Sequence, residues 1–255
     1  MNLRVTILGS GTAGGTPRVG GDWGACDPTD PRNRRLRASI LLETDGTSVL
    51  VDTSPDLRQQ ALTAGFDRVD AVLYTHAHAD HAHGIDDLRF FVRGQGGRRI
   101  PAFGAEDTMQ TLRARFPYVF DDVGDKLYPP IVEPKVLRGL VRIGALEAQP
   151  FPQGHGPVTT LGYRFGAFAY STDVIHLPEE AFDVLAGVDT WVVDCLQEAP
   201  HPTHAHLALT LSWIERVRPR RAVLTHLNPT LDHDRLSGLL PAGVEPAYDG
   251  MVLEL

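Results

Sequence analysis

Four side chains that bind metal ions well stand within six residues and directly follow an apolar run. They are His76, His78, Asp80 and His81, and the run before them, residues 71–75, has the composition of a buried strand. No single face of a strand or helix presents all four side chains, whereas a loop that leads into a helix lets them converge. Imidazole and carboxylate groups bind Zn²⁺, Mn²⁺ or Fe at neutral pH. The sequence therefore predicts a metal site at the end of a buried strand.

Strand-like runs bounded by turn residues recur in both halves of the chain. Residues 38–43 and 48–52 flank Asp45-Gly46, a strong hairpin signal, and residues 161–165 and 168–172 flank a tight turn at Gly166-Ala167. Further strands are expected at 5–8, 191–194 and 221–225, and helices at 55–64, at 207–217 and after His81 through Ile85, Leu88 and Phe91. This order predicts an α/β fold in which two sheets pack together under covering helices. Because no linker composition is visible, we expect one domain over residues 1–255 rather than two small ones.

Three later polar residues follow apolar runs of the same kind. His155 comes after the run ending at Phe151, Asp173 closes 170–173, and His226 closes 223–226. Side chains at the end of a strand emerge at the mouth of a sheet. Together with the first cluster, these residues would complete a ligand set for two metal ions.

The run from His76 to His81 resembles the signature of the metallo-β-lactamase superfamily. The resemblance implies that superfamily's four-layer αββα sandwich of two mixed β-sheets and a site for two divalent metal ions, zinc or manganese, with iron or nickel as alternatives. It also implies that His76, His78 and His155 bind one ion, that Asp80, His81 and His226 bind the other, and that Asp173 bridges both.

The N-terminal segments narrow the resemblance to one branch. Residues 8–17 are similar to the opening of the branch that holds the tRNA 3′-processing endonuclease, the accessory protein PqqB and the cyclic phosphodiesterase PhnP. Residues 20–28 and 34–39 look most like the PhnP-type phosphodiesterases. That likeness implies hydrolysis of a small cyclic phosphodiester, such as phosphoribosyl 1,2-cyclic phosphate, by a hydroxide that two metal ions generate. Asp80 would help to orient this nucleophile.

The sequence departs from the PhnP-type pattern at the first loop. Those enzymes often carry several cysteines there that hold a structural zinc, whereas this loop has only Cys26. We therefore expect no third, structural metal and interpret Cys26 as a packed or loop thiol.

A histidine cluster ahead of the helix at 207–217 is the candidate source of a general acid. In this branch a histidine after the aspartate-bearing strand protonates the leaving group, and His204 resembles it best, with His201 as the second choice. His206 fits a position at the helix start better. The general acid is thus expected to be His204, with the choice between His204 and His201 open.

Basic residues that would bind the substrate stay unassigned. Arg34, Arg35 and Arg37, and the arginines within residues 93–99, are all able to bind a second phosphate. A basic, glycine-rich loop is more often simply solvated. Sequence does not decide which arginine reaches the site.

The acidic composition bears on partners. With 24 Lys and Arg against 32 Asp and Glu, the formal net charge is −8, which argues against nucleic acid because phosphate backbones attract basic surfaces. The negative charge therefore weighs against one alternative function, that of a tRNA 3′-processing endonuclease. The other alternative is a PqqB-like accessory or carrier protein that binds without turnover. We expect a small-molecule phosphodiester as the partner, with a homodimer as the default assembly.

The sequence also carries expectations about location. No run approaches the roughly 18 apolar residues of a membrane span. A strand expected from Val5 leaves no room for a signal peptide, and Cys26 and Cys195 are too few for a disulfide scaffold. A cytoplasmic protein is therefore expected.

Overall fold

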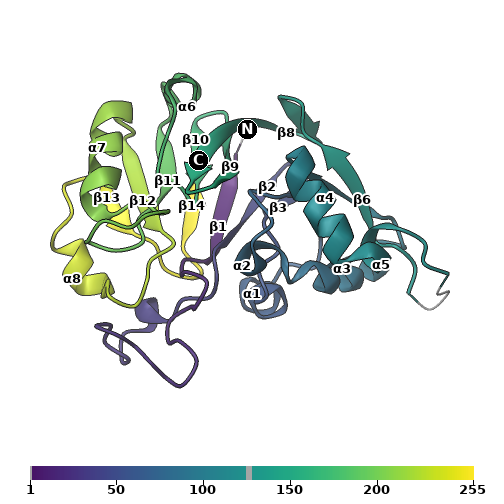
Figure 1. Ribbon diagram of the computed structural model, residues 1–255, viewed down its shortest axis with the longest axis horizontal. Coiled ribbons are helices and arrows are strands. Elements are labelled where there is room, and N and C mark those ends of the chain that lie inside the picture. The colour runs from purple at the N-terminus through teal and green to yellow at the C-terminus, as the bar shows by residue number, and fades with distance from the viewer. Residues whose placement is uncertain (1, 125–127) are drawn as a thin grey trace.

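The computed structural model describes residues 2–124 and 128–255, and the strands in these residues form two seven-stranded sheets (Figure 1). The first has the order β14-β1-β2-β3-β4-β5-β6. Its strands are β14 (Val252–Glu254), β1 (Arg4–Gly9), β2 (Ser39–Thr44), β3 (Thr47–Val51), β4 (Ala71–Leu73), β5 (Ile100–Gly104) and β6 (Val132–Val136). The second has the order β13-β12-β11-β10-β9-β8-β7. Its strands are β13 (Val244–Pro246), β12 (Arg221–Thr225), β11 (Thr190–Asp194), β10 (Phe168–Ser171), β9 (Val158–Phe165), β8 (Leu146–His155) and β7 (Val141–Ile143).

Both sheets are mixed, with an antiparallel half and a parallel half. In the first sheet β14, β1, β2 and β3 pair antiparallel, and β3 to β6 pair parallel. In the second, β7 to β10 pair antiparallel, and β10 to β13 pair parallel. Parallel neighbours place their carboxyl ends at the same edge of the sheet, which is where this fold class builds its sites.

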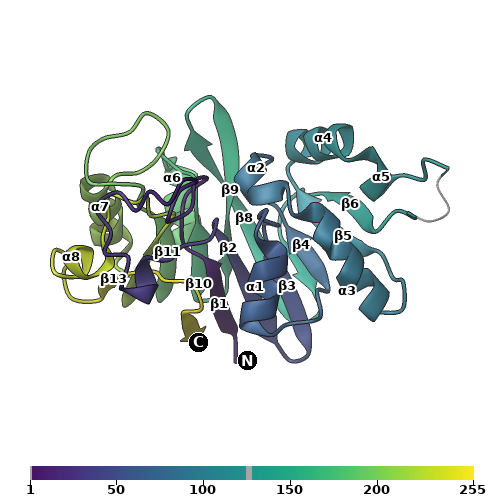
Figure 2. The same ribbon diagram turned by 90° about the horizontal axis from the view of Figure 1, so that it is seen from below.

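Helices cover the outer face of each sheet, and Figure 2 shows the two groups on opposite sides of the sheets. On the first sheet lie α1 (Leu57–Ala64), α2 (Ala79–Ala82), α3 (Leu88–Gly94), α4 (Glu106–Arg115) and α5 (Pro117–Phe120). On the second lie α6 (Glu179–Leu185), α7 (Leu207–Val217) and α8 (His233–Ser237). Short 3-10 turns span Pro31–Asn33 and Ile85–Asp87. The expected four-layer αββα sandwich is confirmed. None of the helices in the described ranges is long and apolar enough to cross a membrane.

The core between the sheets follows from the two-residue period of the strands. Val5 and Ile7 of β1 pack inward against aromatic residues of the second sheet, such as Tyr163 and Phe168. Leu8, with the opposite parity, belongs to the layer under α1 to α5. Alternate residues of one strand therefore join two different apolar layers.

Local signals in the sequence predict several elements well. The hairpin at Asp45-Gly46 is confirmed, and both turn residues have the positive φ, 43° and 75°, that a tight two-residue turn of this kind requires. The helix at 207–217 and the strand at 221–225 match α7 and β12.

The helix expected after His81 is broken. The structure has α2, a 3-10 turn and α3 instead, because the backbone near Gly84 bonds to a neighbouring segment. Thr53 N–H donates to His81 O at 2.8 Å, and Gly84 N–H donates to Thr53 O at 2.9 Å. A Cβ at Gly84 would lie 1.9 Å from Ser54 O, so this close approach requires glycine.

Strand β8 is much longer than its sequence indicates, since Pro150 and Pro152 argue against a regular strand. Among the described residues, β7 pairs with β8 only from Leu146 to Ala148. Between Ala148 and Gly154 this edge of β8 pairs with no strand among the described residues, so proline, which lacks an N–H donor, is tolerated there, and β8 runs on to His155.

Candidate metal centre

The candidate metal site lies at the carboxyl ends of the parallel strands. A polar side chain stands at or just beyond the end of five of them. Asp52 follows β3, His76 comes after β4, Asp173 comes after β10, Asp194 closes β11, and His226 follows β12. His155 closes the antiparallel strand β8. The strand ends of both sheets thus supply the site.

Three of these strand-end residues have an unusual backbone. Asp52, Asp173 and His226 have φ values of 64°, 53° and 59°, in the left-handed region. Such a conformation costs a non-glycine residue about 1–2 kcal/mol. Asp and His tolerate it better than most residues, and strain of this kind collects at functional sites. The turn after each strand swings the side chain into the shared space.

Imidazole nitrogens converge on the carboxylate of Asp173. His81 Nε2 and His226 Nε2 lie 3.0 Å and 3.4 Å from its Oδ1. His76 Nε2 and His155 Nε2 lie 3.8 Å and 3.6 Å from its Oδ2. Each carboxylate oxygen therefore faces a different pair of the predicted ligands.

All seven residues predicted as ligands lie together, in the partition that the family resemblance implies. His76, His78, His155 and Asp173 form one group, and Asp80, His81, Asp173 and His226 form another. Within each group the ligand atoms lie within 4.8 Å of one another. Asp173 is common to both, as a bridging residue would be.

The donor set fits a pair of divalent cations. His76 Nε2 and His226 Nε2 are buried, and neither has a hydrogen-bond partner among the described residues. A buried polar atom without a partner costs about 1–3 kcal/mol. Because imidazole and carboxylate are ligands of zinc, manganese and related ions, bound cations would satisfy these nitrogens and offset the charges of Asp80 and Asp173.

Hydrogen bonds to the other ring nitrogen orient the histidines. Asp52 Oδ2 lies 2.7 Å from His81 Nδ1, and Asp52 also accepts from the Thr75 backbone N–H and hydroxyl. Thr203 O lies 2.7 Å from His155 Nδ1. Partners of this kind fix the ring orientation and leave Nε2 facing the metal.

Burial keeps two of the histidines neutral. It lowers the pKa of His76 well below its usual value, and neighbouring imidazoles add to the effect. Burial likewise lowers the pKa of His155, against the opposing charge of Asp173. The neutral imidazole is the form that binds a metal ion.

The carboxylates of the site are held in the charged form. Burial would raise the pKa of Asp173, but the surrounding His226 and His81 hold it well below its usual range. His81 and His226 hold the pKa of Asp80 below its usual range in the same way, against the effect of burial. In return, these carboxylates raise the pKa of both imidazoles although burial opposes it.

His204 lies at the rim of this cluster. Its Nδ1 is 3.1 Å from Asp194 Oδ2, and its Nε2 is 3.8 Å from Asp173 Oδ2. The ring of His201 lies farther out, with its centroid 5.3 Å from that of His204. His206 occupies the N-cap position of α7. Of the three, His204 is the one whose ring nitrogen faces Asp173.

Sequence reasoning missed Asp52 and Asp194. Both stand at the end of a strand, as do Asp173 and His226, so the same positional signal was present. Asp194 serves two neighbours, because its Oδ2 also accepts from the Val174 backbone N–H at 3.0 Å.

The basic residues considered from sequence have other partners. Arg37 pairs with Asp56 at 2.8 Å, Arg35 donates to Leu231 O at 2.7 Å, and the guanidinium of Arg34 stacks on the ring of Trp23. In the 93–99 segment, Arg98 pairs with Asp70, Arg99 donates to backbone carbonyls, and Arg93 stacks on Phe90.

A cavity of about 240 Å³ adjoins the candidate site. His76, Ala77 and His78 line it together with residues of α4, among them Arg115. Arg115, which the sequence did not single out, is thus the arginine beside the histidines. Only the tertiary packing of α4 shows this.

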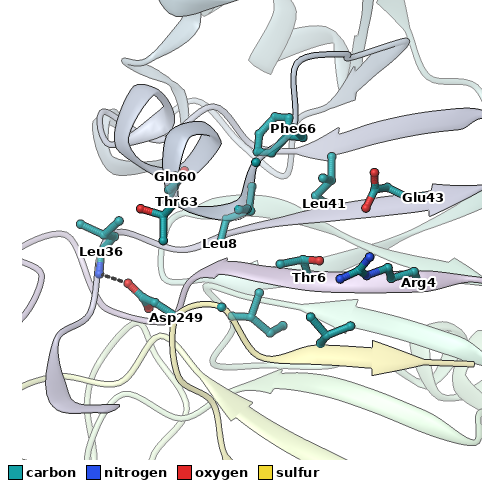
Figure 3. Close-up of a pocket in the computed structure, with 15 residues that line it drawn as sticks. Arg4, Thr6, Leu8, Leu36, Leu41, Glu43, Gln60, Thr63, Phe66 and Asp249 are labelled. Carbon is teal, nitrogen blue, oxygen red and sulfur yellow. Dashed lines mark hydrogen bonds between the residues drawn. The ribbon is translucent and has the colours of Figure 1, made fainter. Parts of the chain in front are cut away.

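The glycine-rich segment after β1 packs against its own chain. A Cβ at Gly9 would lie 1.9 Å from Arg37 O, so glycine is needed for this close approach. Beside it, Asp249 accepts hydrogen bonds from the Ser10 backbone N–H and hydroxyl at 2.9 Å and 2.8 Å and from Leu36 N–H at 2.6 Å. Figure 3 shows Asp249 at one end of a cavity of about 330 Å³ that none of the candidate metal ligands lines.

The first loop holds one more polar cluster. Asp30, His233 and Asp234 lie together, and Arg32 bonds to both carboxylates at 2.8 Å and 2.7 Å. Cys26 is buried beside it, with Sγ 3.4 Å from Pro229 O, as expected of a packed thiol.

Comparison with known proteins agrees with this architecture. Residues 47–227 match the family model described as a beta-lactamase superfamily domain. The crystal structure of a diphosphatase from the PhnP family superposes with a TM-score of 0.93 at 38% sequence identity, covering 100% of this chain and 98% of that one. Zn²⁺-bound PqqB from Methylobacterium extorquens, 20% identical, has the same fold with a TM-score of 0.76 over 99% of this chain and 100% of its own.

One curated relative is longer than this chain. An octanoyltransferase of Porphyromonas gingivalis is 32% identical over 256 residues, which cover 98% of this chain and 51% of the relative. The chain thus spans about half the length of that protein.

Proposed function

Because the chain belongs to the metallo-β-lactamase superfamily, and within it to the PhnP family, we propose that it is a metal-dependent hydrolase of a small phosphodiester. The observation that carries the proposal is the pair of ligand groups that share Asp173. The PhnP-family diphosphatase described above supports hydrolysis of a phosphate compound, because it is similar to this chain over the full length of both proteins.

His76, His78 and His155 would hold one ion, Asp80, His81 and His226 the other, and Asp173 would contribute to both. When bound, such a pair of cations lowers the pKa of a water molecule and offsets the negative charge of a phosphate group. The chain's own part is to fix the positions of these ligands. The hydrogen bond that His81 Nδ1–H donates to Asp52 is an example, since it holds the ring with Nε2 toward Asp173.

His204 is the proposed proton donor to the leaving oxygen. Its Nδ1 is held by the buried carboxylate of Asp194, so Nε2 faces the site. A proton on Nε2 can pass to the departing alkoxide, while the contact with Asp194 keeps the ring oriented. His201 stays the second choice for this role, because His204 rather than His201 has a ring nitrogen near Asp173 in the part of the chain that the structure describes.

The proposed substrate is a small cyclic phosphodiester of the phosphoribosyl 1,2-cyclic phosphate class. The cavity beside His76 and His78, about 240 Å³, is below the range of pockets for drug-sized ligands and suits a sugar phosphate. The net charge of −8 speaks against a polynucleotide.

The test is a hydrolysis screen with metal analysis. Purified protein, stripped and reloaded with Zn²⁺ or Mn²⁺, would be assayed on bis(p-nitrophenyl) phosphate, ribose 1,2-cyclic phosphate 5-phosphate, a dinucleoside diphosphate and a tRNA precursor. We expect two ions per chain and turnover of the cyclic diester. Preference for the dinucleoside diphosphate would show that the protein cleaves a diphosphate bond rather than the proposed phosphodiester bond. Cleavage of the tRNA precursor alone would favour the endonuclease. Two bound metals without turnover of any substrate would favour an accessory or carrier protein.

A further inference from the structure

One face of α4 lines the cavity beside the histidines. Thr108, Thr111 and Arg115 are spaced i, i+3 and i+7, so they share one stripe of the helix. His76 and His78 line the same cavity, and Val158 at the start of β9 adds an apolar side chain. The cavity is therefore bordered by two candidate metal ligands, two hydroxyl groups and a guanidinium.

Arg115 is tied to the ligand loop itself. One of its Nη atoms donates to the carbonyl of Ala77, the residue between His76 and His78. A guanidinium has five N–H donors in a planar fork, so this bond leaves most of them for another acceptor. Among the described residues, no carboxylate forms an ion pair with Arg115. Its neighbour Arg113, by contrast, pairs with Asp121 at 2.7 Å.

The one carboxylate among the residues that line the cavity, that of Asp107, forms no ion pair with this guanidinium. Asp107 lies eight residues earlier on α4, about 12 Å along the helix axis. Its Oδ1 accepts from the Thr108 backbone N–H at 2.8 Å, in the first turn of the helix. No ion pair among the described residues therefore neutralises the charge of Arg115 beside the cavity.

We infer that Arg115 binds a second anionic group of the substrate, a phosphate away from the bond that is cleaved, and so selects substrates with two phosphates. The inference rests on the proposed function, because it places the scissile phosphate at the metal ligands. The planar fork of arginine suits two oxygens of a phosphate group. The size of the cavity limits the spacer between the two phosphates to something like a single sugar ring.

The experiment uses a matched pair of substrates, ribose 1,2-cyclic phosphate with and without a 5-phosphate. The full-length, metal-loaded protein and the variants Arg115→Ala, Arg115→Lys and Arg113→Ala would each be assayed on both. We expect the wild type to have a higher kcat/KM for the 5-phosphorylated substrate. Arg115→Ala should lower that preference about tenfold or more, mainly through KM, as expected for loss of a charge-assisted hydrogen bond. Arg115→Lys should restore part of it, and Arg113→Ala should keep all of it.

A preference that survives Arg115→Ala would overturn the inference, as would equal losses on both substrates or a wild type without preference. The metal content of each variant would also be measured, because loss of the hydrogen bond from Arg115 to Ala77 could disturb the neighbouring candidate ligands. A second measurement separates this inference from the proposed function. Calorimetric titration with ribose 5-phosphate, with ribose as the reference, should show binding to the wild type that Arg115→Ala weakens about tenfold. This result would support the anion site even if neither cyclic substrate were hydrolysed, and equal binding to both proteins would refute it.

Discussion

Nδ1 of His204 lies 3.1 Å from Oδ2 of Asp194, and this pair joins the loop before α7 to the end of β11. Asp194 is fully buried, whereas His204 is partly exposed at the rim of the candidate metal site. The pair therefore has the arrangement of a buried carboxylate that orients a proton-donating imidazole.

Replacing His204 should slow turnover without loss of metal. Because general acid catalysis contributes about 10²–10⁴-fold, His204→Ala should lower kcat by that order on a cyclic diester with an alkoxide leaving group. The loss should be much smaller with bis(p-nitrophenyl) phosphate, whose leaving group needs little protonation. His201→Ala serves as the comparison. A larger, leaving-group-dependent loss in His201→Ala would transfer the role to His201.

Asp194→Asn should act through His204. We expect kcat to fall about 10–100-fold while KM changes little, as is typical when an orienting partner is removed. The decisive measurement is a double-mutant cycle, since Asp194→Asn should have almost no further effect on kcat in the His204→Ala background. Additive losses would show that Asp194 works by another route, for example through His226, whose Nδ1 lies 3.8 Å away.

Asp173→Ala should reduce metal content and activity together. Its two carboxylate oxygens face His81 and His226 on one side and His76 and His155 on the other. Without them, both ion sites lose a ligand. Elemental analysis after dialysis should give fewer than two ions per chain. Two bound ions per chain and full activity in this variant would show that Asp173 does not bridge the two ions.

Chelation should lower the melting temperature, because the ligands come from segments attached to both sheets. A ligand present at 1,000 times its dissociation constant stabilises the folded state by about 4 kcal/mol. For a chain of this size each kcal/mol shifts Tm by about 2–4 °C, so we expect a drop of about ten degrees that added Zn²⁺ or Mn²⁺ reverses. Calorimetry or circular dichroism would measure it. His204→Ala should show the same drop, and an unchanged Tm would argue that no ion couples the sheets.

The pH dependence of stability should carry a contribution from Asp249. Burial raises its pKa to about 7 in spite of the hydrogen bonds from Ser10 and Leu36. A carboxyl with a raised folded pKa binds protons more tightly in the folded state, so its contribution to stability is complete below about pH 4 and is lost as the pH rises through 7. Urea unfolding between pH 4 and 8 should show this fall in the free energy of unfolding, added to the contributions of other titrating groups. The fall should be smaller in Asp249→Asn. Equal slopes in both proteins would contradict it.

The grouping of the candidate metal ligands could be predicted because two independent signals coincide at His76, His155, Asp173 and His226. Residue type marks a ligand, and the end of an apolar run marks the mouth of a sheet. Asp52 and Asp194 have the same position, but a lone carboxylate after a strand gains meaning only when a histidine from another segment is placed beside it. His81 and His204 are those histidines.

Other features depend on tertiary contacts that no local pattern records. The helix after His81 breaks because Thr53, almost thirty residues earlier, bonds to its backbone. Arg115 enters the site because α4 packs beside the loop at Ala77. Local patterns thus predict the sandwich and the candidate ligand set, whereas the residues that line the neighbouring cavity follow from packing.

The left-handed backbone at Asp52, Asp173 and His226 restricts how this centre could be re-engineered. A cysteine introduced at any of the three would have to accept a torsion angle that suits it poorly, on top of any change in metal preference. His78, with an ordinary φ of −65°, carries no such constraint. Attempts to recruit thiophilic metals should therefore begin in the first histidine loop, because the strand termini admit few side chains other than those already there.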